Sequence, residues 1–260
     1  NKGDRTYAMD EHGHISEASG KKILNFSITK NVASMLIGVL LLFFILQSVA
    51  KSYQKNNGVP RGLQAFIEPL VLFVKDDVAK PNIGHNYKKY LPYLLTLFFF
   101  ILINNLLGLL PGAANVTGNI ALTLVLSVFT LIITNFSGNK NYWSHIFNPL
   151  GNSMGWAAKG PLYVILLPIE ILGIFIKPVA LMIRLFANMT AGHIVILSLL
   201  SLILMAQSGL GTAGAFGVAP VSVAFVLFMY LIELLVAFLQ AYIFTLLTSL
   251  FIGLAIVEDH

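Results

Sequence analysis

The chain has 260 residues, of which 57% are hydrophobic and only 10% are charged. Soluble domains carry about 25% charged residues, so this composition excludes an ordinary soluble domain and indicates a polytopic membrane protein. The absence of cysteine excludes disulfides and thiolate metal sites. The net charge of +5 is spread over loops, which indicates topology signals and lipid headgroup contact and argues against nucleic-acid binding.

The first 27 residues differ in character from the remainder of the chain. They are polar, with balanced acidic and basic side chains, and we expect an extramembrane segment there. Because the sequence begins at Asn1 and not at Met, two origins stay open, removal of a leader or truncation. Residues 28–257 contain the apolar segments, without an internal repeat or a long linker, and we expect them to form one integral membrane domain.

Hydropathy predicts three spans and one interfacial helix in the first half of that domain. The spans lie at about 30–49, 91–110 and 118–136. Residues at about 60–75 are amphipathic, begin at Pro60, and have an apolar part too short to cross a bilayer, so we expect an interfacial helix. Residues 137–160 are polar and rich in Asn and Gly, and we expect a loop with a short surface helix.

Two very long apolar segments follow, at about 161–207 and 220–257. A continuous helix over the first would be about 70 Å long, whereas the hydrocarbon core is about 30 Å thick. It either folds back into two upright spans or tilts steeply. Charges along its whole length disfavour two lipid-exposed spans. We therefore expect an all-α membrane protein of about five membrane helices, the last two forming a strongly tilted, near-horizontal hairpin.

The distribution of Lys and Arg predicts the orientation. Residues 50–90 hold seven of them, namely Lys51, Lys55, Arg61, Lys75, Lys80, Lys88 and Lys89. Residues 137–160 hold Lys140 and Lys159, whereas residues 208–219 hold none. The positive-inside rule then places the first two loops in the cytoplasm. Five membrane elements with an external N-terminus and a cytoplasmic C-terminus fit this pattern.

Few formal charges interrupt the two long segments. They are Glu170, Lys177, Arg184 and Glu233. A guanidinium cannot lose its proton in a protein, and at bilayer depth it costs about 2.5–3.5 kcal/mol on insertion scales. At about 100° per residue, Glu170, Lys177, Arg184 and Asn188 fall within a band of about 40°. We therefore expect a functional polar stripe centred on Arg184.

The neighbouring positions predict how this stripe is used. A second stripe of small residues follows three residues later and would let another helix approach closely: Gly173, Ala180, Ala187 and Ala191. His193 lies about 180° from Arg184 and thus faces another environment. Glu233 is the only carboxylate of the last segment and is the expected partner of His193. Gln240 shares a face with Glu233, and we expect it to hydrogen-bond Arg184 or Asn188.

Structural interpretations stay open for several of these residues. Lys177 can simply pair with Glu170, seven residues away, and Pro178 is expected to bend the helix. His193 and Glu233 can be satisfied core residues. Asn104 and Asn105 are expected to make caps or interhelical hydrogen bonds more readily than to carry an ion.

Four runs of residues resemble a known family. The runs KPVALMIRLFANMTAGHIVI (177–196) and MYLIELLVAFLQAYIFTLLTSLFI (229–252) resemble the most characteristic motifs of subunit a of F-type ATP synthases. The runs NNLLGLLPG (104–112) and TGNIALTL (117–124) resemble its preceding signature. The resemblance covers most of residues 60–257 and leaves out the N-terminal 27.

The resemblance implies a non-catalytic stator subunit of the Fo sector. It would provide two proton half-channels to a rotating c-ring and couple proton flow to rotation and ATP synthesis. The implied partners are c-ring subunits, subunit b of the peripheral stalk, other Fo and F1 subunits, and membrane lipid. We expect no cofactor and no metal. The implied place is the bacterial inner (plasma) membrane, with the mitochondrial inner membrane as an alternative, and protons are favoured over sodium.

The resemblance also implies roles for single residues. Arg184 matches the essential arginine that faces the ring, and Asn188 and Gln240 match its associated amides. His193 and Glu233 match a relay pair whose two members are exchanged relative to several bacterial relatives, as in mitochondrial ones. Glu170 matches a carboxylate that precedes the arginine, with Lys177 as a further candidate. Asn119 stands where the family often has an acid, which weakens its candidacy.

Other functions are compatible with a polytopic membrane protein. A secondary ion transporter would be supported by inverted repeats and by broken helices in both halves, whereas here the charges crowd into one half. A pumping subunit of another membrane complex would usually spread buried lysines and acids over many spans. A structural scaffold does not explain an arginine that has no acid three or four residues away.

Overall fold

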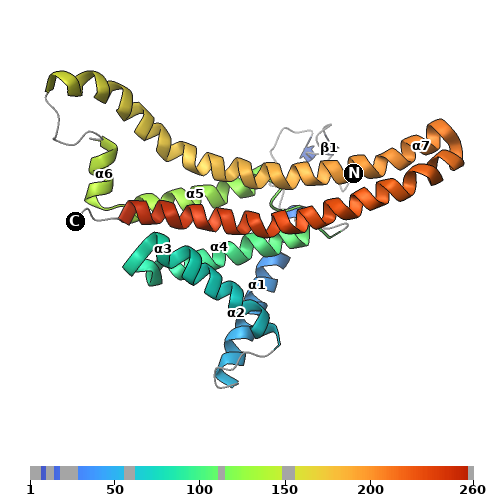
Figure 1. Ribbon diagram of the computed structural model, residues 1–260, viewed down its shortest axis with the longest axis horizontal. Helices are drawn as coiled ribbons and strands as arrows, with labels where there is room; N and C mark the ends of the chain where they lie inside the picture. The colour runs from blue at the N-terminus through green and yellow to red at the C-terminus, as the bar shows by residue number, and fades with distance from the viewer. Residues whose placement is uncertain are drawn as a thin grey trace.

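The computed structural model describes residues 7–9, 15–17, 29–55, 62–110, 115–147 and 156–256. Within these residues, five helices are long and apolar enough to cross a membrane, which confirms an all-α membrane protein (Figure 1). A small hairpin pairs β1 (Tyr7–Met9) with β2 (Ile15–Glu17) in the antiparallel sense. It belongs to the expected extramembrane segment, whose other residues lie outside the described ranges.

The expected interfacial helix is longer than the sequence pattern predicts. After α1 (Lys30–Lys55), α2 (Leu63–Phe73) continues through a π-helical turn (Val74–Ala79) into α3 (Lys80–Ile83). The charged residues Lys75, Asp76 and Asp77 lie on that π turn, and its remaining residues are buried. The chain changes direction at Gly84, after α3, where φ is +68°, a value that favours glycine. Pro60 lies outside the described residues.

The next three helices agree closely with the prediction. They are α4 (Tyr87–Gly108), α5 (Ile120–Ser137) and the short surface helix α6 (Lys140–Phe147). Asn119 caps α5, because its Oδ1 accepts a hydrogen bond from the Ala121 N–H at 2.9 Å. Near the end of α4, Asn104 Nδ2 donates to the Phe100 carbonyl of its own helix. Asn105 Nδ2 donates to the Ala237 carbonyl at 3.2 Å, so it makes the interhelical bond that was expected of this pair.

The last element is α7 (Trp156–Ile256), which consists of two arms that reverse at Gly211. Gly211 has φ +71° and ψ −167°, and it is the one residue of α7 with a non-helical backbone. The prediction of a longer connection over residues 208–219 is therefore wrong, because one glycine in a left-handed conformation reverses the chain without further loop residues. The helix also continues through Pro178. The two arms lie side by side in Figure 1.

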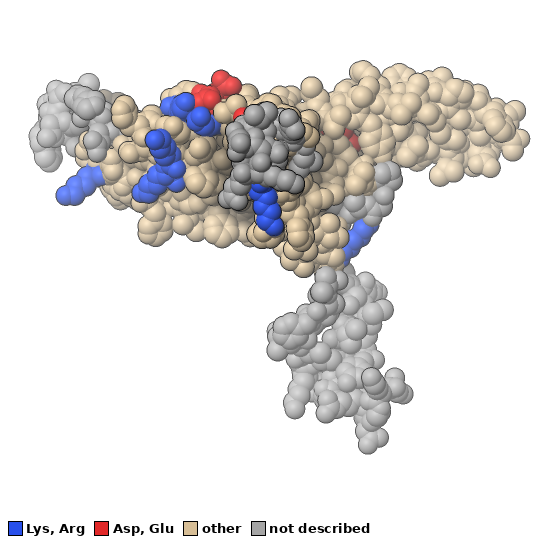
Figure 2. Space-filling model, turned by 90° about the horizontal axis from the view of Figure 1, so that it is seen from below, with Lys and Arg blue, Asp and Glu red and all other residues tan. Residues whose placement is uncertain are grey.

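The core lies where the two arms of α7 pack against α4 and α5. Leu181 and Leu185 of the first arm are almost completely buried, as is Phe244 of the second. Phe98 of α4 meets Phe238 of α7 edge to face, with 6.0 Å between ring centroids. The tip of the hairpin extends beyond this core (Figure 1). Residues 194–232 contain no charged side chain, and the tip carries none in the face shown in Figure 2.

The end of α7 opposite the tip is fastened to two other segments. The Asn139 backbone N–H donates to the Ala255 carbonyl at 3.0 Å, and its side chain donates to the Ile256 carbonyl at 2.9 Å. From α3, Asn82 Nδ2 donates to Ser249 Oγ at 3.0 Å. Gly253 lies against the Asn82 backbone so closely that a Cβ there would overlap the Asn82 carbonyl. Hydrogen bonds and close packing therefore hold this end.

Candidate functional site

Arg184 lies in the middle of the first arm of α7, beside the core residues Leu181 and Leu185. Its side chain is partly buried, and its Nη1 atom is enclosed without a hydrogen-bond partner in the described part of the chain. An enclosed guanidinium nitrogen is costly unless something accepts its hydrogen bonds. The structure thus presents a fixed positive charge with donor capacity left over.

One helical turn further, the two arms are joined by a pair of amides. Asn188 Nδ2 donates to Gln240 Oε1 at 2.9 Å, and Gln240 is only 2% exposed. This confirms that Gln240 bonds a residue of the polar stripe, and the structure selects Asn188 over Arg184 as that residue. The Gln240 carbonyl oxygen is therefore engaged by Asn188, whereas the buried Gln240 Nε2, like Arg184 Nη1, has no hydrogen-bond partner in the described part of the chain.

His193 and Glu233 meet across the two arms, as their positions predict. His193 Nδ1 lies 3.5 Å from Glu233 Oε1, and the glutamate side chain is only 7% exposed. On its other side, His193 Nε2 donates to the Gly108 carbonyl at 3.1 Å. A carbonyl only accepts, so Nε2 carries the proton of this contact and Nδ1 faces the carboxylate. His193 Nδ1 and both Glu233 oxygens have no hydrogen-bond partner in the described part of the chain, so the two side chains are close enough for an ion pair but form no hydrogen bond with each other.

Two residues near this pair were not singled out from the sequence: Gly192 lies against Glu233, and Asn115 contacts α7 one turn before His193. A Cβ on Gly192 would lie 2.9 Å from Cδ and 3.0 Å from Cγ of Glu233, so the carboxylate depends on glycine there. Asn115 Nδ2 contacts the Met189 carbonyl at 3.4 Å, and its Oδ1 accepts from the Gly118 N–H at 2.8 Å. In the sequence, the only indication of a role for Gly192 is that it precedes His193. Nothing in the sequence indicates a role for Asn115.

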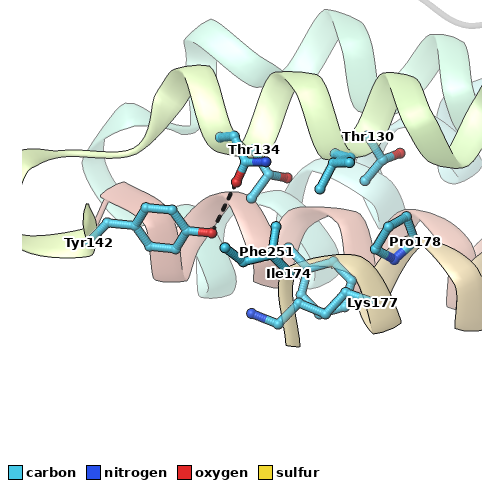
Figure 3. Close-up of a pocket in the computed structure, with 9 residues that line it drawn as sticks. Thr130, Thr134, Tyr142, Ile174, Lys177, Pro178 and Phe251 are labelled. Carbon is cyan, nitrogen blue, oxygen red and sulfur yellow. Dashed lines mark hydrogen bonds between the residues drawn. The ribbon is translucent and has the colours of Figure 1, made fainter. Parts of the chain in front are cut away.

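Glu170 and Lys177 lie nearer the start of α7. Lys177 lies beside residues of α5 and α6 (Figure 3). The Lys177 ammonium sits over the Phe251 ring, 5.4 Å from its centroid, in a cation–π contact. On α6, the Tyr142 hydroxyl donates to Asn135 Oδ1 at 3.2 Å. Burial raises the pKa of Tyr142, and the Glu170 carboxylate raises it further, which places Glu170 within electrostatic reach of α6.

The structure therefore sorts the predicted residues into three groups. Arg184, Asn188 and Gln240 form one, and His193 with Glu233 forms a second beside the end of α4. Glu170 and Lys177 belong to the third group, with α5 and α6. Asn119 is a helix cap and joins none of them. The described residues contain no group of three or more His, Asp or Glu side chains arranged to hold a metal ion.

Comparison with known proteins identifies the family. The family model described as ATP synthase A chain matches residues 32–253. The chain is 51% identical over 261 residues to ATP synthase subunit a 2 of Chlorobaculum tepidum, and the aligned region covers 96% of this chain and 69% of that protein. It is 47% identical over 242 residues to ATP synthase subunit a of Chloroherpeton thalassium, covering 91% and 69%. With five apolar helices and a family match over most of its length, this multi-pass membrane protein belongs to the ATP synthase A chain family.

Proposed function

We propose that the chain is the proton-translocating stator subunit of the Fo sector of an ATP synthase, not itself catalytic. The observation that carries the proposal is Arg184, a permanent charge at the centre of an apolar helix, with one buried nitrogen free to bond a group outside the described chain. Family membership supports the same role. The proposed partner is a carboxylic acid on a rotating ring of c subunits, and subunit b and the other Fo and F1 subunits complete the complex.

The mechanism follows from the charge of Arg184. A carboxylic acid that faces lipid stays neutral, because burial disfavours its charged form. When rotation brings it near Arg184, the guanidinium favours ionisation, and the proton leaves into one half-channel. Past the arginine, the carboxylate takes a proton from the other half-channel and can enter lipid again. The fixed cation also repels protons, so it prevents direct passage between the half-channels.

His193 and Glu233 are the proposed relay of the external half-channel. Their contact across the two arms lies on the α4 side of α7 and is buried on the glutamate side. The Gly108 carbonyl orients the imidazole so that Nδ1 exchanges protons with the carboxylate. Asn188 and Gln240 hold the arms together next to the arginine. Glu170, close to Tyr142, is proposed to belong to the cytoplasmic route, and Lys177 is considered below.

Orientation and geometry complete the proposal. The N-terminus lies outside and the C-terminus in the cytoplasm of a bacterial inner membrane, in accord with the Lys and Arg distribution. The first arm of α7 includes the candidate span Leu162–Gly209, which is about 70 Å long and so must tilt strongly along the ring. Each proton that crosses the field contributes about 2.3 kcal/mol per 100 mV, so each ATP requires several protons.

Replacing Arg184 tests the proposal. In inverted membrane vesicles with the assembled complex, Arg184→Ala is expected to abolish ATP-driven proton pumping. Arg184→Lys is also expected to fail, because lysine is a compact charge that can deprotonate when buried. Lys88→Ala, which removes an exposed cation of α4, is the matched control and is expected to pump normally. Normal coupled pumping by Arg184→Ala would refute the proposed function.

A further inference from the structure

A column of hydroxyl groups runs along the face of α5 that is buried against the rest of the chain. It consists of Thr123, Ser127, Thr130 and Thr134, spaced one helical turn apart and between 0% and 7% exposed. Over these residues the helix rises about 16 Å, roughly half of a hydrocarbon core. Asn119 and Asn135 lie at its two ends. The column is thus a polar stripe on an otherwise apolar helix.

Three of the four hydroxyls are occupied by their own helix. Thr123 donates to the Ile120 carbonyl at 3.1 Å, Ser127 to Leu124 at 2.8 Å and Thr130 to Leu126 at 3.2 Å. Such bonds to the preceding turn satisfy a buried hydroxyl donor. The fourth differs, because Thr134 Oγ1 is enclosed and has no hydrogen-bond partner in the described part of the chain. A buried hydroxyl left in this state favours a bound polar molecule.

Thr134 lines a small cavity between α5, α6 and the two arms of α7 (Figure 3). The cavity offers about 10 Å³ to the centre of a water molecule, which is room for one water and too little for a phosphate or a lipid headgroup. Its walls combine apolar side chains with polar groups of Thr130, Asn135 and Tyr142. Thr130 Oγ1 also lies 3.2 Å from the Tyr93 hydroxyl of α4, so polar contacts continue inward from the cavity.

Lys177 supplies the charge of this cavity. Its side chain forms part of the wall, and its ammonium stays over the Phe251 ring, which also lines the cavity. In Figure 3 the lysine nitrogen points to the Tyr142 side. Two other titratable groups lie near the cavity, namely Tyr142, which lines it, and Glu170, whose carboxylate raises the pKa of Tyr142. Arg184, seven residues further along α7, is not among the residues that line the cavity.

We propose that this cavity binds one water molecule and that Lys177 is a second electrostatic barrier, which keeps protons from passing along the hydroxyl column of α5. The inference rests on the proposed function, because a leak matters only where a proton gradient is held. A water bonded to Thr134 extends the column towards the surface. The Lys177 ammonium, which is only partly buried, lies beside that water and repels a hydrated proton.

The test separates leak from rotary flow. Vesicles with the assembled complex are treated with a carbodiimide, which modifies the ring carboxylate and closes the rotary route, and passive proton uptake is measured under an imposed potassium diffusion potential. In Lys177→Met the remaining uptake is expected to rise about tenfold, the effect of about 1.4 kcal/mol on a barrier. Lys177→Arg keeps the charge and is expected to stay at the level of the unmodified chain.

A second substitution identifies the route. Lys177→Met with Thr134→Val is expected to return to the level of the unmodified chain, because valine keeps the shape of threonine and removes the hydroxyl. Lys177→Met with Thr96→Val is the matched control and is expected to keep leaking, since Thr96 is an exposed hydroxyl of α4 bonded to its own helix. Unchanged uptake in assembled Lys177→Met complexes, or a leak that survives Thr134→Val, would overturn the inference. Failure of the proposed function would instead appear as a lack of carbodiimide-sensitive pumping in the unmodified complex.

Discussion

Adding one methyl group at Gly192 tests whether the position of the Glu233 carboxylate matters. A Cβ there would lie 2.9 Å from Cδ and 3.0 Å from Cγ of Glu233, whereas carbon atoms in contact are about 3.5–4.0 Å apart. The Cβ would also overlap Glu233 Oε1, so the carboxylate must move by about 1 Å or more, and forced shifts in packed interiors cost about 1–3 kcal/mol. Glu233 Oε1 already lies 3.5 Å from His193 Nδ1, so a further shift separates the pair.

Gly192→Ala is expected to reduce ATP-driven pumping by about tenfold or more, the effect of about 1.4 kcal/mol on a barrier, while the complex still assembles. Pumping is followed in inverted vesicles by quenching of a pH-sensitive dye, and assembly by ATP hydrolysis and immunoblotting. Gly217→Ala, at a position with nothing within 4 Å, is the control and is expected to be silent. Combining Gly192→Ala with Glu233→Asp, a shorter carboxylate, is expected to cost less than the sum of both changes. Normal pumping by Gly192→Ala would refute the reasoning.

Three further outcomes are expected. Exchanging His193 and Glu233 for each other should retain more pumping than either single change, and equal loss in all three would argue against a working pair. A double-mutant cycle of Asn188→Ala and Gln240→Ala should give a coupling of about 1 kcal/mol in the thermal stability of the complex, and strict additivity would contradict their bond. Because burial raises the Tyr142 pKa above 10.0, the folded chain holds that proton more tightly than the unfolded chain. The protonated Tyr142 hydroxyl therefore stabilises the fold below about pH 10, and this stabilisation is lost as the pH rises through the folded-state pKa. Tyr142→Phe should remove this part of the alkaline destabilisation that melting curves measure.

Much of the fold follows from hydropathy and helical spacing. The spans of α4 and α5 and the short α6 agree with prediction, because long apolar runs bounded by polar residues leave few alternatives. Residues 208–219 differ from the prediction, which left them between the two long helices, whereas in the structure they are helical except at Gly211. Small and apolar residues are compatible with loop or helix, and the conformation of this one glycine sets where the chain reverses. The helix after α2 was likewise extended by tertiary burial of its π turn, which no local pattern reports.

In the candidate site, too, some contacts could be predicted from the sequence and others depend on tertiary packing. Glu233 was the expected partner of His193 because it is the only carboxylate of the last segment, and Gln240 was expected to reach the polar stripe because it shares a helical face with Glu233. Spacing could not show that Gln240 selects Asn188, that Gly108 orients the histidine, or that Gly192 leaves room for the carboxylate. Those details depend on how closely backbones approach, and this distance is set by the packing of the whole bundle.

The fastening of one end of α7 has a mechanical consequence. Asn139 and Asn82 anchor the end near Ile256, whereas the tip at Gly211 extends beyond the core (Figure 1). The packed length of the hairpin is held by the core, and only the tip projects beyond it. A sideways load at Arg184 therefore falls on a part of the arm that the buried Leu181 and Leu185 fix in the core. Such a load passes into the packed bundle and the anchored end, and the projecting tip bears little of it.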